Sequence, residues 1–193
     1  AFALSRGSAG LIVSAHMAGA LLGVLSAIPL ARHPLARWRV GIAVSLLTLG
    51  ALFAGLAYSW ALTLVGALTI GLAYGALTIG INSLFAVGYG ERSPAMVNLV
   101  NAIFGIGAML SPLLIVLFVE RPQISFMVVA AVSACLIPFA FMMDDRLTNT
   151  TQATEARSNP LLVAFIGFLA LGVGVEVSTI GYAATYLIFT GLS

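Results

Sequence analysis

Long apolar stretches, separated by shorter polar connections, make up most of the chain. Six of them have roughly the 20 residues that an α-helix needs to cross a bilayer. They are Ala9–Leu30, Val40–Tyr58, Ala61–Val87, Ala95–Val119, Ser125–Met143 and Pro160–Thr190. No stretch shows the strict alternation of apolar and polar residues that membrane β-strands require. The pattern therefore predicts an all-α fold, a polytopic membrane helix bundle with six transmembrane helices.

The composition excludes most water-soluble classes of protein. Of the 193 residues, 61% are hydrophobic and 7% are charged, whereas a soluble domain has about 25% charged residues. This excludes a cytosolic enzyme, a disordered chain and a nucleic-acid binder, and the net charge of +2 forms no basic patch. The single cysteine, Cys135, excludes a disulfide framework and a CxxC site. The expected surroundings are a lipid bilayer.

One connection is long and polar enough to separate two parts of the chain. Residues 144–159 read DDRLTNTTQATEARSN, whereas the other connections are short. We expect a boundary there, with five helices in 1–143, a linker in 144–159 and one helix in 160–193. Because the chain begins with Ala1 and ends at the edge of an apolar helix, we expect it to be an internal piece of a longer membrane protein.

The arginines predict how the helices are oriented. Positively charged loops stay in the cytoplasm. The first, third and fifth connections hold six arginines, and the opposite side holds two. The six are Arg32, Arg37, Arg39, Arg92, Arg146 and Arg157, and the two are Arg6 and Arg121. We therefore expect these three connections to be cytoplasmic, in a protein of the bacterial inner membrane.

Glu176 is the polar residue that fits the bilayer least well. A carboxylate at the membrane centre costs about 2.5–3.5 kcal/mol on insertion scales. At 100° per residue, one side of the predicted last helix also carries Gly172, Thr179 and Tyr186. An acid, a hydroxyl and a phenol on one face suit a hydroxylated solute. Glu176 is therefore a candidate solute ligand or a site for a coupling proton or sodium ion, with a bond to a neighbouring helix as the structural alternative.

Three asparagines give the middle helices a polar character. Asn82 shares a helix face with Tyr74 and Thr78, while Asn98 and Asn101 are three residues apart and therefore adjacent on their helix. Amides offer both donors and acceptors, as sugar hydroxyl groups require. The alternative is that they hold helices together, a bond worth about 0.6 kcal/mol on average.

The remaining candidates for chemistry are few. His16 lies in the first predicted helix near Gly19 and Gly23, whose G-x-x-x-G spacing is typical of helix packing. It is a candidate proton relay or a partner for a neighbouring helix. The sequence has no metal-ligand spacing, no Gly-rich phosphate loop and no nucleophile–base motif. We therefore expect no enzyme activity, no metal site and no cofactor.

Three motifs resemble one family. The run NLVNAIFGIGAMLSPL at 98–113 is similar to the N-L-x-N-x-x-F-G-x-G-A-x-x-x-P-L run of fucose–galactose–glucose:proton symporters and their vertebrate glucose-transporter-like relatives. GINSL at 80–84 resembles the fourth-helix Asn motif of that branch. GVEVS at 174–178, with Tyr186-Leu187, resembles its seventh-helix signature. The chain thus resembles helices two to seven of the major facilitator superfamily. In the fucose-type symporters a glutamate stands where this chain has Thr78.

The resemblance implies a partial major facilitator fold and a secondary active transporter that moves a small polar solute, most simply a sugar, by alternating access. The further helices of the same transporter would be its partners. The residues that would contact the solute are Asn82, Asn98, Asn101, Glu176, Thr179 and Tyr186, and Glu176 would also carry a coupling proton or sodium ion. The alternatives are a drug or metabolite exporter of the same superfamily, a self-contained six-helix channel or a membrane assembly protein.

Overall fold

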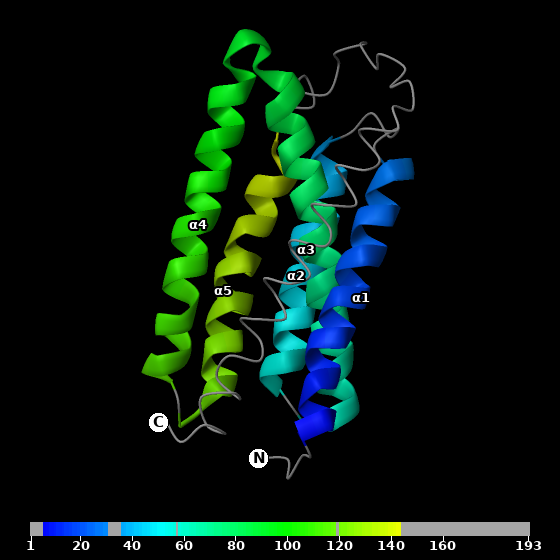
Figure 1. Ribbon diagram of the computed structural model, residues 1–193, viewed down its shortest axis with the longest axis vertical. Coiled ribbons are helices and arrows are strands. Elements are labelled where there is room, and N and C mark those ends of the chain that lie inside the picture. The colour runs from blue at the N-terminus through cyan, green and yellow to red at the C-terminus, as the bar shows by residue number, and fades with distance from the viewer. Residues whose placement is uncertain (1–5, 31–35, 57, 119, 144–193) are drawn as a thin grey trace. The chain divides into compact units, whose positions relative to one another are not determined.

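The computed structural model describes residues 6–30, 36–56, 58–118 and 120–143. These residues form five long helices and a single 3-10 turn (Figure 1). The helices are α1 (Arg6–Leu30), α2 (Ala36–Leu56), α3 (Trp60–Gly88), α4 (Ser93–Leu117) and α5 (Pro122–Phe141), and the turn η1 (Gly90–Arg92) joins α3 to α4. The chain divides into two units, Ala1–Thr150 and Thr151–Ser193, and every described residue belongs to the first.

All five helices are long and apolar enough to cross a membrane, and no strand is found in the described ranges. The expected all-α class is confirmed for this part of the chain, which indicates an integral membrane protein. The expected sixth helix, Pro160–Thr190, and the linker 144–159 lie outside the described residues. The division at 143 and 159 therefore stays a prediction.

The helix ends differ from the expected ones by a few residues. α2 begins four residues earlier than predicted, at Ala36, so that Arg37 and Trp38 form part of its first turn. Both side chains can bury their stems while their polar ends reach the membrane surface. α5 begins at Pro122 rather than Ser125, because proline lacks only an N–H that the first helical turn does not use.

A glycine seam joins α1 to α3, which contact each other over a longer stretch than any other pair of helices. A methyl group added at Gly71 would collide with the main-chain oxygen of His16, and one added at Gly19 would collide with that of Leu68. The seam is formed by Gly19, Gly23, Gly71 and Gly75. Close approach of main chains gives van der Waals contact that larger residues would prevent. The predicted packing role of Gly19 and Gly23 is thus confirmed, with α3 as the partner.

α2 is the most buried helix and packs against both α3 and α5. Its Thr48 hydroxyl donates to Ser133 Oγ of α5 at 3.0 Å, and both side chains are buried. At one end of the bundle a small core joins α2, α3 and α5. It consists of Ala36, Val40, Val44, Leu84 and Ala140. These contacts join α3 to α2 and α5.

α4 is the most exposed of the five helices. In its span only 6% of the residues are buried, compared with 50% in α2. It runs antiparallel to α3 (Figure 1) after a reversal at Gly90, whose φ of 56° favours glycine. It contacts α3 more than α5. Most of its surface is therefore uncovered by α1, α2, α3 and α5.

The arginines of the described ranges lie at the helix ends. Arg37 and Arg39 begin α2 and Arg92 lies in η1, so these three are at the same end of the bundle. Arg6 and Arg121, at the start of α1 and between α4 and α5, are at the other end. This arrangement agrees with the sides expected from the sequence. Arg32, Arg146 and Arg157 lie outside the described residues.

Candidate functional site

The predicted solute-contacting residues are divided between described and undescribed parts of the chain. Asn82 lies in α3, and Asn98 and Asn101 lie in α4. Glu176, Thr179 and Tyr186 are outside the described residues, so their roles stay predictions. The site that can be described is built from α1, α3 and α4.

One face of α3 carries a polar stripe formed by Tyr74, Thr78 and Asn82. The three residues are spaced by four and therefore follow one side of the helix. The Tyr74 ring centroid lies 5.9 Å from that of His16 in α1 and 6.2 Å from that of Phe104 in α4. The stripe therefore begins on the side of α3 that lies between α1 and α4. We use the name α1–α3–α4 groove for the residues on this side, which are Tyr74, Thr78 and Asn82 of α3, His16 of α1 and Phe104 of α4.

The polar groups of the stripe are not all buried or hydrogen-bonded within the bundle. Tyr74 is 40% exposed, and Thr78 and Asn82 are half-buried. Asn82 Oδ1 is itself buried, yet no described group donates a hydrogen bond to it. An unsatisfied buried acceptor costs about 1–3 kcal/mol. Asn82 is therefore the one predicted site residue for which the structure shows an unmet demand for a donor.

Asn98 and Asn101 are both exposed on α4. Relative to the Phe104–Tyr74 contact, Asn101 is one turn and Asn98 two turns toward the α3–α4 connection. At 1.5 Å per residue, Asn101 lies at about the depth of Thr78 and Asn98 at about that of Asn82. Neither amide donates to Asn82 Oδ1. The structure thus places the three asparagines within about one helical turn of depth and does not join them by that bond.

Exposed amides at this depth cannot face lipid without cost. Transfer of an amide from water to an apolar medium without a hydrogen bond costs several kcal/mol. The carboxamides of Asn98 and Asn101 therefore need a water-lined cavity, a solute or another helix. This requirement applies to the same end of the groove as the unsatisfied Asn82 acceptor.

The sequence alone missed two features of α4. Phe104 was noted only as part of the 98–113 motif, and the structure places its ring beside Tyr74. Ser93 is 6% exposed at the start of α4, and its buried Oγ has no hydrogen-bond partner among the described residues. A pattern of spacing along one helix carries no information about either, because both features depend on which helix lies opposite.

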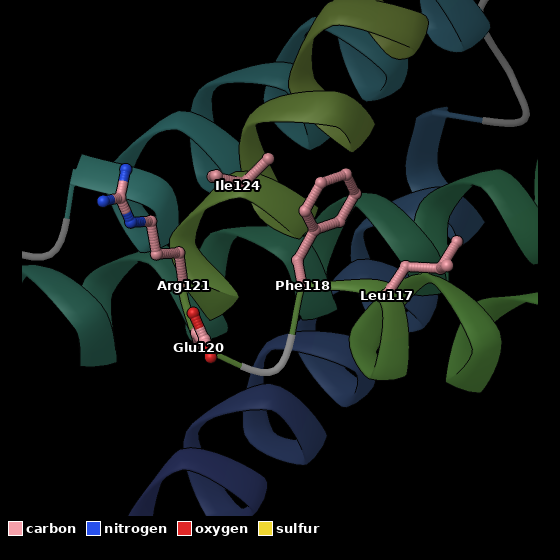
Figure 2. A pocket seen from close by; sticks show the side chains of 5 residues that line it. All are labelled: Leu117, Phe118, Glu120, Arg121 and Ile124. Atoms are coloured by element: carbon pink, nitrogen blue, oxygen red, sulfur yellow. The ribbon is translucent and has the colours of Figure 1, made fainter.

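A hollow of about 310 Å³ is found at the opposite end of α4, in the connection to α5. Figure 2 shows the side chains around it, which come from the end of α4 and the start of α5. They are Leu117, Phe118, Glu120, Arg121 and Ile124. Since Asn98 and Leu117 are 19 residues apart on one helix, the hollow is about 28 Å from Asn98 along α4. It is a surface feature separate from the α1–α3–α4 groove.

No set of three or more His, Cys, Asp and Glu side chains that could hold a metal ion occurs in the described part of the chain. The groove is instead rich in hydroxyl, phenol and amide groups. Such groups can donate and accept hydrogen bonds with a neutral polar molecule. The described residues thus define a membrane helix bundle with polar groups on the side of α3 that lies between α1 and α4.

Comparison with known proteins does not assign the chain to a family. No protein-family model matches the chain, and no curated protein and no solved structure is detectably similar to it.

Proposed function

We propose that this chain belongs to a secondary active transporter of the major facilitator superfamily, which moves a small polar solute, most simply a sugar, by alternating access. The polar stripe on α3 is the observation that carries the proposal. Tyr74, Thr78 and Asn82 follow one side of a helix that is long enough to span the bilayer, and Asn82 keeps an unsatisfied acceptor there. In transporters of this kind the solute site lies near the bilayer midplane between helices.

The groups of the groove fit a hydroxylated solute. Each sugar hydroxyl donates one hydrogen bond and accepts others, so it can donate to Asn82 Oδ1. Aromatic rings such as Tyr74 and Phe104 provide an apolar surface for the C–H face of a sugar ring. The resemblance of the 98–113 run to the fucose–galactose–glucose symporter branch supports the same class of solute.

A drug or metabolite exporter of the same superfamily is the second candidate. The Tyr74–Phe104 ring pair and the exposed apolar side chains of α4 favour it, because hydrophobic solutes bind to aromatic surfaces. The polar stripe favours the sugar.

The test is counterflow by the full-length protein in liposomes, with a panel of labelled sugars and a panel of apolar cations. We expect saturable counterflow of at least one sugar. Asn82→Ala should weaken its half-saturation about five- to thirtyfold, since one or two hydrogen bonds are lost at about 1 kcal/mol each. The matched control is Ser83→Ala, because the exposed Ser83 hydroxyl donates to Gly80 O of its own helix at 2.9 Å. Counterflow of apolar cations alone would favour the exporter, and no counterflow of either panel would refute the proposal.

A further inference from the structure

Among the residues that the structure describes, His16 is the single His, Arg, Asp or Glu that lies far from the helix ends. It is ten residues past the start of α1, which corresponds to about 15 Å along the helix. The other charged residues of the described ranges lie in first turns or connections. They are Arg6, Arg37, Arg39, Glu91, Arg92, Glu120 and Arg121. An ionisable group at such a depth is retained for a function more often than for packing.

α3 fixes the position of the His16 ring. The main chain of His16 is pressed against Gly71 in the glycine seam, which leaves little freedom to its Cα. The ring hydrogen-bonds the main chain of Ala67 in α3. It also lies beside the Tyr74 ring at 5.9 Å, with an angle of 38° between the two planes. The imidazole is therefore held between the seam and the α1–α3–α4 groove.

The hydrogen bond to Ala67 determines which ring nitrogen of His16 can take up a proton. Ala67 lies inside α3, where its N–H is used by the helix itself, so its carbonyl oxygen is the group that accepts from the ring. A neutral imidazole has one N–H and one nitrogen with a lone pair. With the N–H engaged by Ala67, the nitrogen that carries the lone pair is the one that would take up a proton.

The groups around His16 determine what would stabilise the protonated form. α1 packs mainly against α3, whose one titratable side chain is Tyr74, and the only other ionisable residue of α1 is Arg6 at its start. No carboxylate occurs on either helix. The Tyr74 ring can nevertheless stabilise an imidazolium, because a cation within about 6 Å of a ring centroid is attracted by the π-face. Tyr74 is thus the partner of the charged form as well as a member of the polar stripe.

We propose that His16 is a proton-binding site of this protein, and that its protonation is linked through Tyr74 to solute binding in the α1–α3–α4 groove. The proton adds to the ring nitrogen that carries the lone pair, and the resulting imidazolium draws the Tyr74 ring toward α1. Movement of that ring changes the shape of the groove at the point where Tyr74, Thr78 and Phe104 meet the solute. The linkage rests on the proposed function, whereas proton binding itself does not.

Proton binding is tested without transport. In the full-length protein with isotope-labelled histidine, the imidazole signal that disappears in His16→Asn should shift with pH as the ring gains and loses a proton. His33→Asn, in a connection, is the matched control and should leave that signal in place. A His16 signal that keeps one protonation state from pH 4.5 to 9 would overturn the inference, whatever the protein transports.

The linkage is tested with two variants that keep a hydrogen-bond donor but bind no proton, His16→Asn and His16→Gln. In liposomes, both should lose solute accumulation driven by a pH gradient at least tenfold, and they should lose the pH dependence of solute affinity. Counterflow, which needs no net proton movement, should stay within about twofold of wild type. Accumulation with wild-type pH dependence in either variant would overturn the linkage. Absence of counterflow in the wild type would instead refute the proposed function.

Discussion

The glycine seam between α1 and α3 predicts that the effect of a Gly→Ala substitution on the free energy of unfolding depends on its position. Gly71 of α3 faces the main chain of α1, whereas Gly105 of α4 has no atom within 4 Å of the place where a Cβ would lie. Gly71→Ala and Gly105→Ala add the same methyl group to a spanning helix. The two substitutions should nevertheless change the free energy of unfolding in opposite directions.

At Gly71 the added Cβ would collide with His16 O and lie 2.9 Å from Ala20 N. These are main-chain atoms, so no side-chain rotation can relieve the contact and the two helices must move apart. Overpacking of this kind costs about 1–3 kcal/mol. The upper half of that range applies, because separation at Gly71 also opens the contacts at Gly19, Gly23 and Gly75. Alanine returns about 0.5–1 kcal/mol through its higher helix propensity, so the net loss is about 2 kcal/mol.

At Gly105 only the propensity difference remains, so Gly105→Ala should be neutral or stabilising by up to about 1 kcal/mol. The assay is unfolding of the chain in dodecyl maltoside micelles titrated with sodium dodecyl sulfate. Tryptophan fluorescence is the readout, since Trp38 packs edge-on against Phe141 at 5.2 Å and reports the joined bundle. A loss of about 2 kcal/mol corresponds to a roughly 30-fold change in the unfolding equilibrium. Equal midpoints for Gly71→Ala and Gly105→Ala would show that the seam does not hold α1 on α3.

Three further predictions concern other parts of the chain. In a double-mutant cycle, Thr48→Val and Ser133→Ala should show a coupling of about 0.6 kcal/mol, because the single Thr48 proton is shared between Ser133 Oγ and Val44 O, both at 3.0 Å, and the Ser133 hydroxyl donates to Val129 O at 2.8 Å; a coupling of zero would mean that the bond between α2 and α5 contributes nothing. In a Cys135→Ala background, needed because Cys135 is exposed, Thr150→Cys should resist membrane-impermeant maleimide added to intact cells, and efficient labelling would reverse the assigned orientation. Glu176→Gln in the full-length protein should lower counterflow and accumulation by a similar factor, about tenfold or more, since a charged hydrogen bond is worth about 1.5–3 kcal/mol; wild-type values of both would remove Glu176 from the site.

The lengths and places of the five described helices could be predicted from the sequence because a bilayer sets both. Runs of about 20 apolar residues leave few alternatives. The ends were harder to predict, as at α2, where Arg37 and Trp38 are tolerated in a first turn at the membrane surface. Hydropathy indicates whether a segment prefers lipid or water as a whole. It therefore does not show which polar side chains near a helix end can reach the membrane surface.

The partners of each helix could be predicted only in part. The spacing of Gly19 and Gly23 indicated a close contact, but nothing in it distinguishes α3 from α2 as the neighbour. The common face of Tyr74, Thr78 and Asn82 followed from helical periodicity. The position of the Tyr74 ring between α1 and α4 did not, because it depends on the packing of three helices that are distant in sequence.

The pairing of α1 with α3 and of α2 with α5 has a consequence for biosynthesis. α1 has its main partner, α3, beyond α2 in the sequence, and α2 contacts α5 almost as extensively as its neighbour α3. When α1 leaves the ribosome, the glycines that its own glycines must meet are still about 50 residues from being made. At roughly 5–20 residues per second this delay lasts about 3–10 s. During that time the bare main chain at Gly19 and Gly23 is open to lipid or to a foreign helix with small residues. An insertase or chaperone that shields α1 until α3 arrives would therefore increase the yield of the correctly joined bundle.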